Sequence, residues 1–108
     1  MGSINFRTVD LNLLAPLRVL LVERHVTRSA EKLGISQPAM SASLARSRTL
    51  FRDPLLVRGA KGLVLTPRAE QLLEQLDHVM AVIAEMVSLP IEFTPETSQR
   101  TLDRKSVV

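Results

Sequence analysis

Apolar residues recur at helical spacing in four stretches of this chain, and each stretch is bounded by residues that start or stop helices. In the first stretch, leucines and valines from Leu11 to Val22 repeat every three or four positions. Asp10 or Asn12 can cap this segment at its start, and the pattern ends near residue 24. The pattern predicts an opening helix of about three turns.

Two short helices joined at a glycine are predicted next. Thr27 is the expected N-cap of a helix that Gly34 ends, because glycine takes the left-handed C-terminal conformation without penalty. Ser36 is expected to cap the following helix, with Pro38 in its first turn. This pair predicts a helix-turn-helix, whose second helix can enter the DNA major groove while the first braces it against the backbone.

The second helix of this pair has a buried stripe with one polar interruption. Met40, Leu44 and Phe51 follow spacings of four and seven, and Pro54 ends the region. Ser47 lies on the same stripe, where an apolar residue is expected. Either its hydroxyl bonds back to a backbone carbonyl or the position is a local weakness.

A short hairpin is predicted over residues 55–66. Two apolar runs, 55–57 and 63–65, flank a turn at 59–62 that contains two glycines. The tip is basic, with Arg58 and Lys61. A hairpin that follows a helix-turn-helix forms a wing.

The last stretch predicts a helix of about 22 residues and roughly 33 Å. It starts at Thr66-Pro67, a cap followed by proline at the first helical position, and runs to about Ser88. Its apolar stripe is wider than a coiled-coil seam and too long to be covered by so small a domain, so we expect it to pack on a copy of itself. The expected dimerisation residues are Ala69, Leu72, Leu73, Leu76, Val79, Met80, Ile83, Met86 and Val87.

Charge divides the chain into two parts. Residues 1–68 hold eleven Lys and Arg against four Asp and Glu, a net charge of +7, and residues 69–108 have a net charge of −4. A basic first part is typical of proteins that bind a polyanion, although an ordinary solvated basic face would give the same count.

Several classes of function are disfavoured by the composition. There is no cysteine, which excludes disulfides and thiolate metal sites and favours a cytoplasmic location. The N-terminus does not resemble a signal peptide, and no run reaches the roughly 18 apolar residues of a membrane span. His25 and His78 have no partner at metal-ligand spacing, and the serines have no nearby base. We therefore expect no metal, no cofactor, no membrane association and no catalytic residue.

Four motifs occur in order along the chain: VTRSAEKL at 26–33, SQPAMS at 36–41, LFRDPLLVR at 50–58 and LTPRA at 65–69. With these motifs, residues 11–101 resemble the N-terminal DNA-binding domain of LysR-type transcriptional regulators. The subgroup that contains nodulation and aromatic-catabolism regulators is the most similar. Two positions depart from the family pattern: Ala42, where arginine is frequent, and Ser47, where leucine is usual.

The resemblance implies a mainly α fold, in which a winged helix-turn-helix of three helices and a β-hairpin precedes a long dimerisation helix. The expected divisions are a tail at 1–8, the DNA-binding domain at 9–66, the linker helix at 67–89 and a linker or truncated start of an effector domain at 90–108. The effector-binding site of the family is expected to be absent from this chain.

Double-stranded DNA is the expected partner, bound by a homodimer. The resemblance gives Gln37, Pro38 and Ser41 a base-reading role, and glutamine can bond both N6 and N7 of adenine. The full set of expected DNA-binding residues is Thr27, Arg28, Ser36, Gln37, Pro38, Ser41, Ala42, Arg46, Arg58 and Lys61.

Two other functions are compatible with the same pattern. The chain could be an interaction module that forms mixed dimers with full-length regulators through the residue 69–87 stripe. It could also be a winged helix that binds RNA, which would show no preference for duplex DNA.

Overall fold

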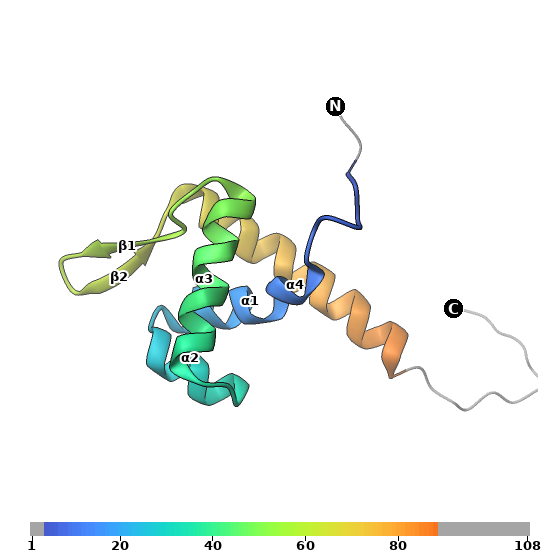
Figure 1. Ribbon diagram of the computed structural model, residues 1–108, viewed down its shortest axis with the longest axis horizontal. Coiled ribbons are helices and arrows are strands. Elements are labelled where there is room, and N and C mark those ends of the chain that lie inside the picture. The colour runs from blue at the N-terminus through green and yellow to red at the C-terminus, as the bar shows by residue number, and fades with distance from the viewer. Residues whose placement is uncertain (1–3, 89–108) are drawn as a thin grey trace, which may run out of the picture.

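The computed structural model describes residues 4–88, and every structural statement below refers to this part of the chain. The elements follow in the order η1 (Leu11–Leu13), α1 (Leu14–Glu23), α2 (Val26–Leu33), α3 (Gln37–Phe51), β1 (Leu56–Gly59), β2 (Gly62–Leu65) and α4 (Pro67–Val87) (Figure 1). The first of these, η1, is a single 3-10 turn. This order confirms the predicted fold of three helices, a hairpin and a long final helix. The segment predicted at 90–108 lies outside the described residues, as do the first three residues of the predicted tail.

The first helix is entered through a short tight turn. Of the two predicted caps, Asp10 is confirmed, since its carboxylate accepts a hydrogen bond from the backbone N–H of Asn12 at 2.9 Å. The turn η1 (Leu11–Leu13) continues into α1 (Leu14–Glu23), which ends where Arg24 adopts a left-handed conformation with φ of 53°.

Helix α2 (Val26–Leu33) begins two residues earlier than predicted. Thr27 is not its cap. Because Arg24 turns the chain out of α1, the next residue, His25, is the extended one, and its Nδ1 accepts from the backbone N–H of Arg28 at 3.1 Å. Thr27 therefore lies inside the first turn, where its hydroxyl cannot serve as the N-cap.

The turn between α2 and α3 (Gln37–Phe51) has the geometry that the sequence predicts. Gly34 has φ of 76°, and its N–H donates to the carbonyl of Ala30 at 2.9 Å. Ser36 is extended, and its hydroxyl accepts from the N–H of Ala39 at 3.2 Å. Both predicted capping residues are thus confirmed.

The core lies where α2, α3 and α4 pack against α1. Met40 and Leu44 of the predicted α3 stripe are buried, and Phe51 is partly buried against the core. Ser47 is fully buried, and within the described chain its hydroxyl has no hydrogen-bond partner. The back-bond considered for this serine is not formed. The core contains Leu17, Leu20, Leu21, Ala30, Met40, Leu44, Leu55, Leu56, Ala69, Leu72 and Leu76.

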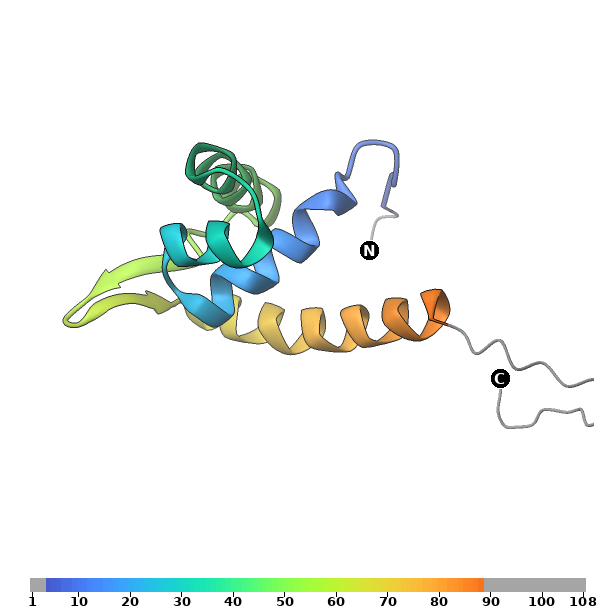
Figure 2. The ribbon, with the colours of Figure 1, turned by 90° about the horizontal axis from the view of Figure 1, so that it is seen from below.

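The predicted hairpin consists of β1 (Leu56–Gly59) and β2 (Gly62–Leu65), which pair antiparallel. Leu56 lies opposite Leu65, and Gly59 lies opposite Gly62. The two intervening residues, 60 and 61, form the turn. Figures 1 and 2 show the hairpin projecting from one end of the helical core as a wing.

Helix α4 (Pro67–Val87) starts directly after the hairpin. The hydroxyl of Thr66 accepts from the N–H of Ala69 at 3.0 Å, as predicted for the cap. Near this end, the Arg68 guanidinium lies over the Phe51 ring, 5.8 Å from its centroid. The first half of α4 packs on α1, and the second half extends beyond the three-helix core (Figure 2).

Candidate nucleic-acid interface

The start of α3 presents its side chains to solvent. Gln37, Pro38, Ser41 and Ala42 are all exposed, whereas Met40 in the same turns is fully buried. The cap at Ser36 sets where the helix begins, and the buried methionine fixes its rotation. The first two turns of α3 therefore carry a surface of amide, hydroxyl and pyrrolidine groups.

Arg46 is exposed and lies two to three turns from the start of α3. It follows Ala42 by four residues, so the two positions lie on one side of the helix. This places a cation beyond the small polar surface at the start of α3.

The N-terminal turn of α2 carries Thr27 and Arg28, both exposed. The Arg28 side chain is engaged with Glu23. Its Nη2 donates to the Glu23 carbonyl at 3.4 Å, and its Nε lies 3.5 Å from the Glu23 carboxylate, which also lies 3.4 Å from Lys32 Nζ. Sequence reasoning missed Glu23, because this contact reaches back across the turn between α1 and α2.

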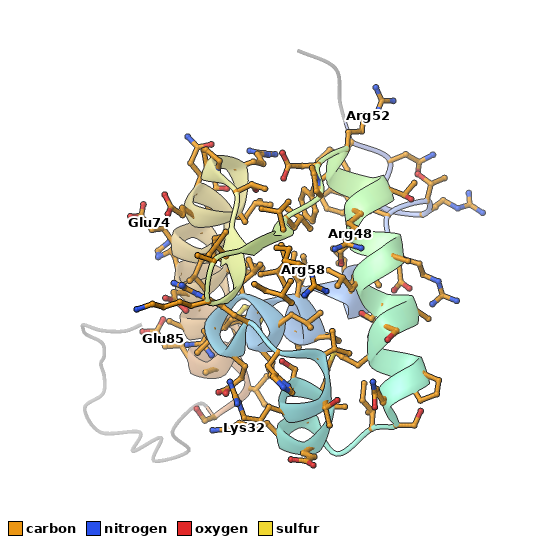
Figure 3. All side chains as sticks on the ribbon, turned by 90° about the vertical axis from the view of Figure 1, so that its left-hand side faces the viewer. Lys32, Arg48, Arg52, Arg58, Glu74 and Glu85 are labelled. Atoms are coloured by element: carbon orange, nitrogen blue, oxygen red, sulfur yellow. The ribbon has the colours of Figure 1, made fainter. Side chains whose placement is uncertain are left out.

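The wing carries two exposed cations. Arg58 is on β1 opposite Leu63, and Lys61 is in the turn. Figure 3 looks at the molecule from the side on which the wing projects, and in it Arg58 and Arg48 are seen between the hairpin and α3. Glu74 and Glu85 are seen on α4 at the edge of this view. Arg48 of α3 and Arg58 of the wing thus lie on the same side of the molecule.

Arg48 has a role that the sequence does not reveal. Its Nε donates to the carbonyl of Pro54 at 2.7 Å, and its Nη2 donates to the carbonyl of Leu56 at 3.0 Å. The guanidinium therefore joins the second half of α3 to the start of the wing. No pattern in the sequence distinguishes this arginine from its neighbours, because its acceptors are backbone carbonyls.

Asp53 binds both ends of the wing. Its Oδ2 accepts from the backbone N–H of Leu55 at 2.8 Å and from the hydroxyl of Thr66 at 2.6 Å. These bonds, first from Thr66 and then from Leu55, lower the pKa of the Asp53 carboxyl, and the charge of Arg68 acts in the same direction. Partial burial opposes them with a smaller effect.

The apolar stripe of α4 is divided between two environments. Ala69, Leu72 and Leu76 are buried in the core of the protomer, and Leu73 is partly buried against it. Further along, Ile83 is 43% exposed and Met86 is 69% exposed. The structure thus buries the first half of the expected dimerisation set within the protomer, leaves Met80 half-buried and leaves the rest exposed. The exposed part of that set is Val79, Ile83, Met86 and Val87.

Residues 4–88 contain no group of three or more His, Asp or Glu side chains arranged to hold a metal ion. Within the same range, no helix combines the length and apolarity that crossing a bilayer requires.

Comparison with known proteins gives one family. Residues 11–70 match the model described as bacterial regulatory helix-turn-helix protein, lysR family. The chain is 52% identical over 84 residues to the HTH-type transcriptional regulator SyrM 2 of Sinorhizobium fredii, covering 78% of this chain and 25% of that protein. It is 42% identical over 95 residues to nodulation protein D of a Bradyrhizobium species, covering 88% of this chain and 28% of that protein. The chain spans about a quarter of the length of the relatives it matches.

The fold has a counterpart in a protein–DNA complex. The crystal structure of the BenM DNA-binding domain with catB site 1 DNA matches with a TM-score of 0.68 and 25% sequence identity, over 74% of this chain and 90% of that one.

Proposed function

Because the chain belongs to the LysR family of bacterial helix-turn-helix regulators, we propose that it binds double-stranded DNA sequence-specifically, as a homodimer, and regulates transcription. The observation that carries this proposal is the start of α3. There Gln37, Pro38 and Ser41 face solvent on a helix that Ser36 caps and Met40 anchors. A protruding helix end with hydrogen-bonding side chains suits the major groove, and the similarity to a DNA-bound domain supports the same use.

Base recognition is assigned to the first two turns of α3. Gln37 can donate to N7 and accept from N6 of adenine, and the Pro38 ring can contact a thymine methyl group. Ser41 can bond to either base of a pair. Ala42 offers no polar contact, so the methyl group of its side chain favours an apolar base edge.

Phosphate contacts are assigned to the flanking cations and to the start of α2. Thr27 and Arg28 lie at the α2 N-terminus, where backbone N–H groups favour an anion. Arg28 would exchange Glu23 for a phosphate, and the Glu23 carboxylate, whose side chain is 18% exposed, would keep its contact with Lys32. Arg46 lies one or two helical turns beyond the base-reading residues of α3 and would contact the DNA backbone.

The wing is assigned to the adjacent minor groove. Arg58 and Lys61 are exposed on a thin two-stranded element that projects beyond the helices. Guanidinium groups are favoured in narrow minor grooves, where the negative potential is strongest. Arg58 is the main contact in this proposal, and Lys61 reaches the bordering phosphates.

Dimerisation is assigned to the exposed half of the α4 stripe. Val79, Ile83, Met86 and Val87 continue the face that is buried earlier in the helix, and they lie on the part of α4 that extends beyond the core. Exposed apolar residues grouped along a helix are favourable to bury against a like surface. A two-fold pair of such helices would present two α3 N-termini to the DNA.

Selection of duplexes from a random pool tests the proposal. The expected winners form an interrupted palindrome, because a two-fold dimer reads the same bases twice. A parallel selection with the Gln37→Ala variant is the matched control. Its winners should lose the consensus base at one position of each half-site. Failure to enrich duplex DNA over single-stranded RNA, or enrichment of unrelated asymmetric sequences, would overturn it.

A second function is favoured by the uncovered apolar half of α4 alone. The chain would form mixed dimers with full-length regulators of the family and displace one of their subunits. Mixing the chain with a tagged full-length relative, followed by size-exclusion chromatography, tests this function. Recovery of only unmixed species would exclude it.

A further inference from the structure

The backbone between α3 and the wing is bent in a way that needs an external constraint. Leu55 has φ of 65°, a left-handed conformation that a branched side chain rarely adopts. Its side chain is fully buried in the core, so the conformation cannot relax without exposing a leucine. Both peptide groups of this residue are bonded, the N–H to Asp53 Oδ2 and the carbonyl to the N–H of Thr66 at 3.0 Å.

A single carboxylate oxygen holds both ends of the wing. Leu55 immediately precedes β1 and Thr66 immediately follows β2, and both donate to Asp53 Oδ2. The Thr66 hydroxyl also caps α4. Asp53 thus connects the end of α3, the base of the hairpin and the start of α4 through two short bonds.

Arg48 adds a second connection at the same place. It spans from α3 to the carbonyls on either side of Leu55, those of Pro54 and Leu56. Asp53 accepts from the N–H of Leu55, and Arg48 donates to the carbonyls of Pro54 and Leu56. Together they hold the chain where it passes from α3 into β1. The orientation of the hairpin relative to α3 follows from these contacts.

Small changes at this base are enlarged at the wing tip. Four residues of β1 span about 13 Å. A rotation of about 10° at the base therefore moves the tip by about 2 Å, enough to break a hydrogen bond to DNA.

We propose that Asp53 is a positioning residue for DNA recognition, which orients the wing relative to α3 and acts on DNA through Arg58 without contacting it. This inference rests on the proposed function. Both bonds are stronger when the carboxylate is ionised, and the lowered pKa of Asp53 favours that state at neutral pH.

A double-mutant cycle between Asp53→Ala and Arg58→Ala tests the proposal on the selected duplex. Each single variant should weaken binding about 10-fold, and the double variant should also be weakened about 10-fold rather than about 100-fold, since both remove the same contact. Both singles should reduce the slope of log affinity against log salt concentration by about one. Discrimination that depends on Gln37 should be unchanged, because α3 itself is intact.

Removing a carboxylate also raises the net charge of the protein, and a matched variant corrects for this. Asp10→Ala removes another carboxylate that accepts a backbone N–H, at the start of η1, and changes the charge equally. Its affinity is the reference for Asp53→Ala. Should Asp53→Ala fail to fold, the comparison of Thr66→Val with Thr66→Ser replaces it, since only serine retains the hydroxyl that binds Asp53.

Additive losses in the cycle, or an affinity equal to that of Asp10→Ala, would overturn the proposal while leaving DNA binding in place. If the wild type binds no duplex, the proposed function fails first. The orientation of the hairpin in the free protein, measured by residual dipolar couplings, then tests Asp53 alone. An unchanged hairpin orientation in Asp53→Ala would refute its positioning role.

Discussion

His25 caps the helix that begins after it, with its Nδ1 accepting the backbone N–H of Arg28 at 3.1 Å. This hydrogen bond satisfies one of the donors that are unpaired at a helix start. An imidazole thus occupies a position more commonly held by serine, threonine, asparagine or aspartate.

Replacing this cap should lower the stability of the domain. His25→Ala is expected to reduce the free energy of unfolding by about 1 kcal/mol, and His25→Asn should restore most of it, because asparagine is among the best N-caps. Urea denaturation followed by circular dichroism measures both. Thr27→Ala is the control, and an equal loss in this variant would return the capping role to the threonine.

Ser47→Ala should stabilise the protein. The hydroxyl is buried and has no partner within residues 4–88, so its removal relieves a desolvation cost of about 1 kcal/mol and adds a better helix former. Ser41→Ala changes an exposed position of the same helix and isolates the propensity contribution. A Tm for Ser47→Ala that does not exceed that of Ser41→Ala would contradict the burial argument.

The contribution of Asp53 to the free energy of unfolding should depend on pH. Its pKa is lower in the folded state than its ordinary value, so the unfolded chain binds the proton first as the pH falls. The stabilisation is therefore fully present above the ordinary pKa of aspartate, about 3.9, and is lost as the pH falls through the folded value. Denaturation of the wild type and of Asp53→Asn should give a difference in unfolding free energy that shrinks as the pH is lowered from about 5 to about 2. A difference that stays constant over this range would contradict it.

Gln37→Ala should weaken binding to the selected duplex by about 1–3 kcal/mol and change binding to random DNA little, because the amide contacts a base. Fluorescence anisotropy at a fixed salt concentration measures both affinities. Gln71→Ala, an exposed glutamine on α4, is the control. Equal losses on the two DNAs would mean that Gln37 contacts only the backbone.

Ile83→Asp should dissociate the proposed dimer without unfolding the protomer, since the side chain is 43% exposed. Leu76→Asp should instead unfold it, with a loss of about 3 kcal/mol or more, because Leu76 is only 4% exposed in the core. Sedimentation equilibrium and thermal melts distinguish the two effects. His78→Asp, five residues before Ile83, places the same charge on another face of α4, and a similar dissociation by this variant would argue against the assigned seam.

The sequence predicts most of the fold because its signals are local. The helix ends are predicted by the backbone and side-chain chemistry of single residues, Gly34, Ser36 and Thr66, and the structure confirms each. The cap at His25 could not be predicted in this way, because its position depends on how Arg24 ends the preceding helix.

The contacts at the base of the wing could not be predicted from the sequence for a different reason. Asp53 and Thr66 are thirteen residues apart and meet only after the hairpin folds back. Similarly, the periodicity of α4 shows a single stripe, and only the packing of α4 on the other elements shows that full burial ends at Leu76. Local patterns identified the elements, while the contacts between elements decided the roles of individual residues.

The division of the α4 stripe into a buried half and an exposed half has a consequence for how a partner would bind. Leu72 and Leu76 complete the interior of the domain from within its own chain, so this core needs no second copy of the protein. Any partner that covers Ile83 and Met86 therefore docks onto a finished domain. Exchange of partners then requires only the separation of two surfaces and no refolding of either chain.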